Sequence, residues 1–131
     1  MKYICNSEND TRDLAIKLSK SKDKIYFLKG NLGVGKTFFV REFLKNLGIR
    51  ENITSPTYQI VKEYHGKVDA YHFDLNRIED YEELIHIDFD EYINSDAYIF
   101  IEWPEIVEDE YQAKVIKFYF DNGNRIIEVE E

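Results

Sequence analysis

The sequence has a single cysteine, two prolines and no long run of apolar residues. A lone cysteine, Cys5, cannot form an internal disulfide, so we expect a buried thiol in a protein of the reducing cytoplasm. No stretch approaches the ~20 apolar residues that a membrane-spanning helix needs. The chain becomes polar within a few residues of its start, which is not typical of a signal peptide. These absences favour a cytoplasmic protein without membrane association.

Basic residues are scarce in the second part of the chain. The net charge is −9, yet residues 1–50 carry 11 Lys and Arg against 5 Asp and Glu, whereas residues 51–131 carry 6 against 21. Residues 78–113 contain 13 acidic residues and neither Lys nor Arg. Non-specific binding to nucleic acid draws on a basic surface, which the whole chain lacks, although its basic first part could still meet a phosphate backbone. The acidic segment is either a solvated surface or a docking surface for a basic partner.

Apolar residues are nevertheless plentiful enough for one core. With 131 residues, 44% apolar and 15% aromatic, we expect a single domain covering residues 1–131. Apolar spacing predicts helices over residues 11–21, with Asn9 or Asp10 as cap, and over 36–47, ended by Gly48. A shorter helical pattern covers residues 79–85.

The remaining apolar segments predict strands. Residues 25–28 and 98–101 are short and fully apolar, as buried central strands are. Two pairs of strands are separated by turn residues: 58–64 and 68–74 around His65-Gly66-Lys67, and 115–120 and 125–129 around residues 121–124.

Three of the six glycines lie in one motif. Residues 30–37, GNLGVGKT, match the phosphate-binding pattern G-x-x-x-x-G-K-[ST] in full. Glycines let the backbone turn its N–H groups toward phosphate oxygens, Lys36 reaches the β- and γ-phosphates, and Thr37 offers its hydroxyl to Mg²⁺. A buried strand precedes the motif and a helix follows it, as this loop requires. We therefore predict a site for ATP or ADP with Mg²⁺ formed by Gly30, Asn31, Leu32, Gly33, Val34, Gly35, Lys36 and Thr37.

This motif completes the prediction of the fold class. We expect an α/β, P-loop NTPase-like domain with a mixed, mostly parallel sheet, flanking helices and an antiparallel C-terminal hairpin.

P-loop proteins also need a carboxylate near Mg²⁺ at the end of a neighbouring strand. Asp74 and Glu102 both end predicted strands, and Glu102 is preferred because its strand is continuously apolar. A glutamate there reaches the metal through water or polarises the attacking water. We therefore predict Lys36, Asp74 and Glu102 as catalytic residues and Thr37, Asp74 and Glu102 as metal ligands. Trp103 either belongs to the core or lines the nucleotide site, and His72 is interpreted as structural.

Four sequence blocks are informative together: GNLGVGKTFFVREFLKNLGI (30–49), TSPTYQIVKEY (54–64), YHFDLNRI (71–78) with EEL (82–84), and IEWPE (101–105). Together they resemble the TsaE (YjeE) family, the ATPase subunit of the bacterial machinery that makes threonylcarbamoyladenosine in tRNA. The P-loop alone is shared by many families, whereas the other three blocks together are far more specific. The resemblance spans roughly residues 7–130.

The resemblance implies roles for particular residues. Thr57 would lie near the γ-phosphate or the metal, Asp74 would be needed for activity, and Glu102 would lie near the metal. The remaining implied nucleotide contacts are Thr11, Trp103 and Arg125.

The resemblance also implies a partner, a TsaB–TsaD-like complex that ATP hydrolysis would reset, with tRNA contacted only indirectly. The chain departs from the family pattern at Asn76-Arg77, where Tyr-Arg is usual, and at His86-Ile87-Asp88, where Gly usually precedes the acidic helix.

Two other functions remain open. A small-molecule kinase also uses a P-loop, but it needs a lid that excludes water, and no arginine-rich lid segment is present. A nucleotide-sensing module without turnover would not need two carboxylates at the ends of strands.

Overall fold

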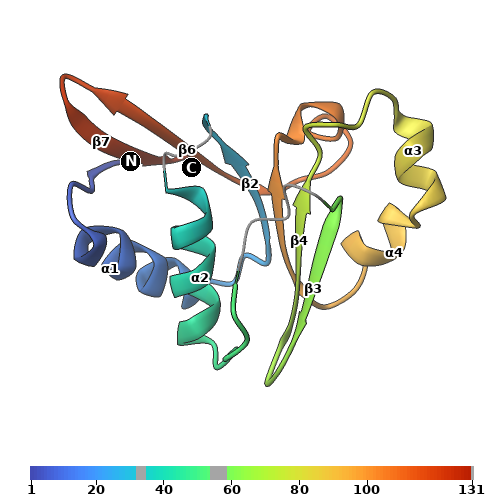
Figure 1. Ribbon diagram of the computed structural model, residues 1–131, viewed down its shortest axis with the longest axis horizontal. Helices are drawn as coiled ribbons and strands as arrows, with labels where there is room; N and C mark the ends of the chain where they lie inside the picture. The colour runs from blue at the N-terminus through green and yellow to red at the C-terminus, as the bar shows by residue number, and fades with distance from the viewer. Residues whose placement is uncertain (32–34, 54–58, 131) are drawn as a thin grey trace.

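A computed structural model describes residues 1–31, 35–53 and 59–130 (Figure 1). Twelve elements are found in these ranges. In chain order they are β1 (Lys2–Ile4), α1 (Glu8–Ser19), β2 (Ile25–Lys29), α2 (Lys36–Asn46), β3 (Val61–His65), β4 (Asp69–Asp74), α3 (Tyr81–His86), α4 (Phe89–Ile93), β5 (Tyr98–Glu102), the 3-10 helix η1 (Pro104–Ile106), β6 (Lys114–Asp121) and β7 (Asn124–Val129).

The strands form one mixed sheet in the order β1-β7-β6-β2-β5-β4-β3. The four inner strands β6, β2, β5 and β4 are parallel to one another. The edge strand β3 pairs antiparallel with β4, β7 pairs antiparallel with β6, and β1 forms the other edge, antiparallel to β7. The predicted α/β class, mixed sheet and C-terminal hairpin are thus confirmed.

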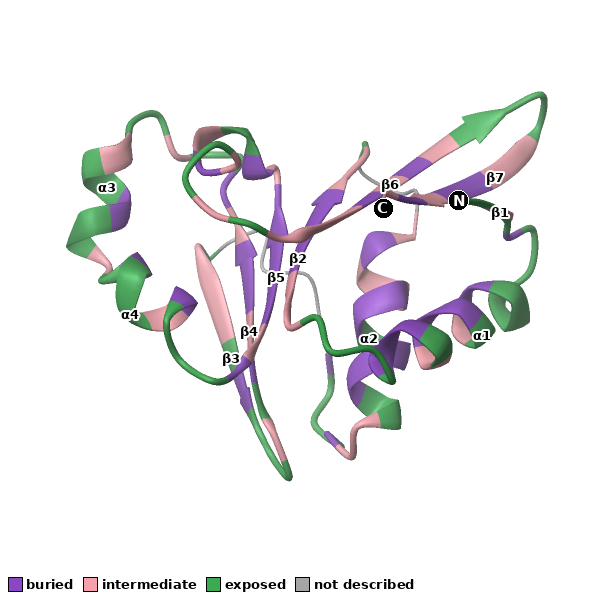
Figure 2. Cartoon of the chain, turned by 180° about the vertical axis from the view of Figure 1, so that it is seen from behind, coloured by how far each residue is buried: buried purple, intermediate pink, exposed green. Residues whose placement is uncertain are grey.

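Helices cover both faces of the sheet, as Figures 1 and 2 show from opposite sides. On β2, Tyr26 and Leu28 point into a core beneath α1 and α2, whereas Phe27 points into a second core beneath α3 and α4. Successive side chains of a strand face opposite sides, so a strand buried on both faces must be continuously apolar. In the first core, Tyr26 stacks on Phe100 with 5.3 Å between the ring centres, and Phe43 meets both rings edge-on. The strand β2, which leads into the predicted phosphate-binding motif, is therefore buried on both faces.

The first helix begins earlier than its apolar pattern predicts. It starts at Glu8, and its cap is Ser7, so the prediction of Asn9 or Asp10 as cap is wrong. The Ser7 hydroxyl accepts a hydrogen bond from the Asp10 N–H, and the Asp10 carboxylate accepts one from the Ser7 N–H. In such a capping box each side chain satisfies an otherwise unpaired backbone donor, which moves the start of the helix upstream.

Two further boundaries differ from the prediction, and one short helix is additional. The hairpin turn is Gly66–Val68, because His65 still pairs with Asp69, and β3 begins only at Val61. Tyr58, where a strand was predicted to start, lies outside the described residues. The five-residue helix α4 was not predicted, since it is too short to show periodicity.

Ser7 should contribute measurably to stability through this capping box. We expect Ser7→Ala to lower the free energy of unfolding by about 1 kcal/mol, because the Asp10 N–H loses its acceptor. Urea unfolding followed by circular dichroism measures the change. Asp13→Ala, an exposed substitution within the same helix, is the control and should stay within about 0.5 kcal/mol. Equal stability of the two variants would contradict this role of the cap.

Candidate active site

The carboxyl ends of three parallel strands meet the start of α2. The register of the sheet pairs Glu102 of β5 with Leu28 of β2 on one side and with Asp74 of β4 on the other. Both predicted carboxylates therefore end neighbouring strands, beside the loop that follows β2. In parallel α/β sheets this edge is where ligands bind.

The start of α2 shows why a glycine precedes the lysine. Gly35 caps the helix with φ of 99°, a left-handed conformation that glycine adopts without a steric penalty. Lys36 and Thr37 are then the first two helical residues, where free N–H groups favour an anion. Gly30 and Asn31 follow β2, whereas Leu32, Gly33 and Val34 lie outside the described residues. The predicted phosphate contacts of these loop residues stay predictions.

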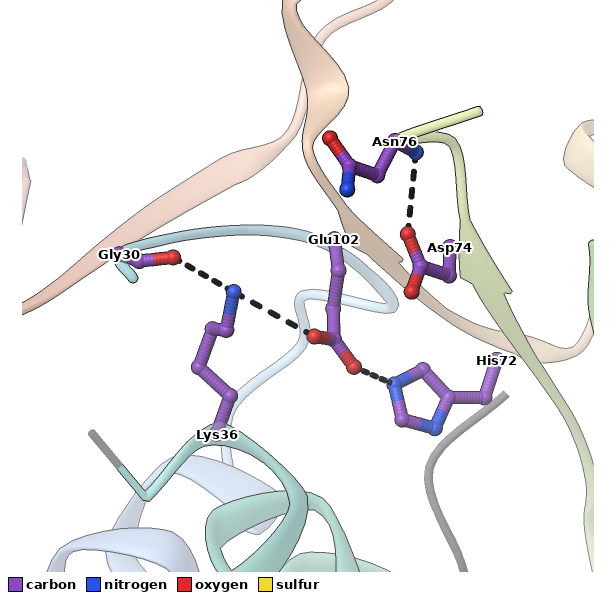
Figure 3. Close-up of polar contacts among 6 residues, drawn as sticks. All are labelled: Gly30, Lys36, His72, Asp74, Asn76 and Glu102. Carbon is purple, nitrogen blue, oxygen red and sulfur yellow. Dashed lines mark hydrogen bonds and ion pairs between the residues drawn. The ribbon is translucent and has the colours of Figure 1, made fainter. Parts of the chain in front are cut away.

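Lys36 is buried at this edge, with only 4% of its surface exposed. Its Nζ donates to the Gly30 carbonyl at 2.6 Å and lies 3.4 Å from Glu102 Oε1 (Figure 3). The same ammonium lies 4.9 Å from the centre of the Trp103 ring. A buried charge needs such partners. Lysine, carboxylate and indole therefore form one cluster, in which Trp103 is half-buried beside the lysine.

Glu102 is held by both of its carboxylate oxygens. Oε2 lies 2.6 Å from His72 Nε2, and Oε1 faces Lys36. Burial by itself would raise the pKa of Glu102, but the hydrogen bond from His72 and the electrostatic interactions with His72 and Lys36 outweigh it, so the pKa lies below its usual value. Glu102 is consequently ionised at neutral pH.

Asp74 differs from its neighbour in both exposure and acidity. It is half-buried, and its Oδ1 accepts a hydrogen bond from the Asn76 N–H at 3.0 Å. Burial raises the pKa of Asp74, the Asn76 hydrogen bond offsets part of this effect, and the negative charge of Glu102 raises the pKa further. A cation at this position would relieve the repulsion between the two carboxylates.

The donor set fits Mg²⁺. Asp74, Glu102 and the hydroxyl of Thr37 would offer hard oxygen ligands, which Mg²⁺ prefers. Within the described ranges, no three His, Cys, Asp or Glu side chains form a group that could hold a metal ion by themselves. This fits an ion that keeps several waters and takes further oxygens from a phosphate.

Two further predicted residues come from other elements: Thr11 is on α1, and Arg125 is on β7, at the opposite end of the strand order from β4. Arg125 Nη1 lies 4.0 Å from the position that a Cβ on Gly35 would occupy, so the fold brings the last strand to the start of α2. Thr11 is 2% exposed, and its hydroxyl has no hydrogen-bond partner in the described part of the chain. Thr57 lies outside the described residues.

Comparison with known proteins identifies the relationship. The model of the family described as threonylcarbamoyl adenosine biosynthesis protein TsaE matches residues 5–127. The chain belongs to the TsaE family. This confirms the resemblance of its sequence blocks.

Relatives in several bacteria carry the name tRNA threonylcarbamoyladenosine biosynthesis protein TsaE. The chain is 40% identical to the protein of Rickettsia felis, over 80% of its own length and 63% of that protein. It is 42% identical to the Haemophilus influenzae protein, over 71% of its length and 60% of the relative. It is 32% identical to the Treponema pallidum protein, over 98% and 99% of the two chains. The matches thus span less than two thirds of the first two relatives and nearly all of the third.

A solved structure supports the same fold. The crystal structure of Bacillus subtilis YdiB superposes with a TM-score of 0.76 and 26% identity, covering 97% of this chain and 82% of that one. In the described part of the TsaE chain, no helix has the length and apolar character needed to cross a membrane.

His72 is the site residue whose role sequence reasoning missed. It was interpreted as structural, yet it hydrogen-bonds directly to Glu102. The register explains the contact: Asp74 is opposite Glu102, so the residue two before Asp74 lies diagonally across from Glu102 on the same face. Strand alternation could have placed His72 and Asp74 on one face, but only the pairing of β4 with β5 brings Glu102 to them.

Proposed function

We propose that this TsaE-family chain is a cytoplasmic, Mg²⁺-dependent ATPase subunit that acts in tRNA threonylcarbamoyladenosine biosynthesis. The observation that carries the enzymatic part is the contact of buried Lys36 with buried Glu102 and half-buried Trp103 beside a G-x-x-x-x-G-K-T sequence, with Asp74 on the adjacent strand. The names of the relatives support the pathway.

The residues divide the work according to their position. Lys36, at the first turn of α2, would exchange its contact with Glu102 for phosphate oxygens. Thr37, Asp74 and Glu102 would hold Mg²⁺, which neutralises phosphate charge when bound. Glu102 is ionised and fixed by two partners, so it is also the better placed of the two carboxylates to orient an attacking water. Trp103, Thr11 and Arg125 would contact the rest of the nucleotide.

Single-turnover hydrolysis tests this function. Purified protein is mixed with ATP labelled in its γ-phosphate and Mg²⁺, with and without a TsaB–TsaD-like complex and tRNA. Release of inorganic phosphate supports the ATPase. Transfer of the label to a small molecule supplied as acceptor would support a kinase instead, and nucleotide binding without phosphate release in any mixture would support a sensor.

The isolated protein should hydrolyse ATP slowly and accelerate when its partner docks. An arginine at the γ-phosphate is worth roughly 10³–10⁵ in rate in P-loop enzymes. Arg12 is in an ion pair with Glu42, and Arg41 lies over the Phe38 ring. Neither arginine therefore contacts the carboxylates beside which the γ-phosphate would lie. Arg125 lies near Gly35, on the nucleoside side. An arginine or an ordering contact from the partner would supply what these positions do not.

We therefore expect steady-state turnover to rise at least about tenfold on addition of a TsaB–TsaD-like complex. If charge drives docking, through the acidic residues 78–113 or the basic first part of the chain, the rise should shrink with increasing salt. Turnover of about 1 s⁻¹ or more by the protein alone, within the ordinary enzyme range and unchanged by the complex, would contradict partner stimulation.

A further inference from the structure

We propose that His72 is a positioning residue: it holds Glu102 Oε2 so that Oε1 faces Lys36 and the predicted phosphate and metal site. The inference rests on the proposed function, because it assigns the orientation of Glu102 a role in binding Mg²⁺ with nucleotide. Figure 3 shows the chain of contacts from His72 through Glu102 and Lys36 to Gly30.

The surroundings of His72 leave its imidazole little freedom. His72 is in the middle of β4, has no exposed surface, and pairs in register with Phe100 of β5. The Phe100 ring meets the imidazole edge-on at 6.5 Å between centres. Glu102 is two residues beyond Phe100 on the same face, so Nε2 reaches Oε2 at 2.6 Å from a strand that cannot shift without disturbing the core.

The direction of this hydrogen bond follows from the chemistry of the two atoms. Nε2 and Oε2 lie close enough to share one hydrogen bond, and an imidazole N–H donates to a carboxylate oxygen, so we assign the proton to His72 Nε2. His72 Nδ1 has no hydrogen-bond partner in the described part of the chain. In metal sites, a residue that does not touch the metal often fixes a ligand through a hydrogen bond of this kind.

Removing the donor would change how Glu102 and Lys36 interact. The carboxylate would keep a buried oxygen without a hydrogen bond. With no second partner to hold it, it could rotate and form a closer ion pair with Lys36, whose Nζ now lies 3.4 Å away. Lysine and carboxylate would then neutralise each other, and both would be less available to phosphate and Mg²⁺. His72 thus keeps the Glu102 carboxylate and the Lys36 ammonium close together while each stays available to Mg²⁺ or phosphate.

Two amides distinguish this role from mere filling of the core. In His72→Gln the side-chain amide extends to about the position of Nε2 and can donate to Glu102. In His72→Asn the amide ends near the position of Nδ1 and cannot. Both substitutions put a neutral amide into the same buried space, so each serves as the matched control for the other.

The measurement is the affinity for ADP by calorimetry, with Mg²⁺ and with a chelator instead. We expect the gain in affinity that Mg²⁺ provides to be at least about tenfold smaller in His72→Asn, as is usual when a residue that orients a metal ligand is lost. The affinity without metal should change less than about threefold. His72→Gln should retain most of the gain. Glu102→Gln should lose it, and adding His72→Asn to Glu102→Gln should cost little more, because both act through one carboxylate.

A second readout does not depend on how well the His72 variants fold. In protein labelled with ¹⁵N-histidine and native at position 72, the Nε2 nitrogen of His72 should carry a slowly exchanging proton. Its ¹⁵N resonance should shift in Glu102→Gln. The resonances of His65 and His86 should not move, because both side chains are exposed and His65 is paired with Asp69.

The outcomes separate the two proposals. If the parent protein shows no gain from Mg²⁺, the proposed function fails and the role of His72 falls with it. If Glu102→Gln loses the gain but His72→Asn keeps it, only the role of His72 is overturned. An Nε2 resonance that is insensitive to Glu102→Gln would overturn it as well.

Discussion

Replacing Lys36 by alanine should abolish binding of ATP and ADP within the range that calorimetry measures, and with it all turnover. Lys36 Nζ is the buried cation nearest to the predicted phosphate site, 2.6 Å from Gly30 O and 3.4 Å from Glu102. Alanine removes the charge that would meet the β- and γ-phosphates and leaves Glu102 as an uncompensated negative charge facing them. Attraction is thus replaced by repulsion at the same point.

The fold should survive this substitution. Glu102 keeps its hydrogen bond to His72, and the apolar cores above and below β2 are untouched. Arg41→Ala is the matched control: it also removes a cation from α2, but an exposed one lying over Phe38. Calorimetry with Mg²⁺–ADP, together with circular dichroism, compares the two. Unchanged affinity and turnover in Lys36→Ala would overturn the phosphate site.

Glu102→Gln and Asp74→Asn should still bind nucleotide, although Glu102→Gln loses the gain in affinity from Mg²⁺, and both should lose hydrolysis by about 10²–10⁴-fold. Each amide keeps the shape of the side chain and removes the charge that holds the metal or activates water. The two carboxylates are neighbours in the sheet register, and burial, the Asn76 hydrogen bond and the charge of Glu102 together set the raised pKa of Asp74. Neutralising Glu102 should therefore also lower the pKa of Asp74, so the two losses should not be additive.

Rapid-quench measurement of phosphate release, at saturating nucleotide, isolates the hydrolytic step. Glu105→Gln is the control, because Glu105 is exposed in η1, three residues beyond Glu102. It should hydrolyse at the parent rate. If Glu102→Gln and Asp74→Asn do so too, the carboxylates at the ends of β4 and β5 are structural and the proposed mechanism is wrong.

Local sequence patterns were sufficient for much of the fold. The apolar runs 25–28 and 98–101 became central strands, because a strand covered by helices on both faces has no polar position. The turn at Asn122-Gly123 takes positive φ at both residues, as a tight hairpin requires, and the register of β6 with β7 follows from it. The cap of α1 was less predictable from local patterns. Asp10 takes part in it, but as the partner of Ser7, which is the capping residue.

The sequence by itself determined the family and the kinds of residues at the site, because GNLGVGKT and the carboxylates ending apolar runs are local patterns. Only the tertiary structure decided which of these side chains meet. The pairing of β4 with β5 joins His72 to Glu102, and the approach of β7 brings Arg125 to Gly35. These contacts link residues 30 and 90 positions apart in the chain. Such distant pairings depend on strand order and register, and no local periodicity encodes them.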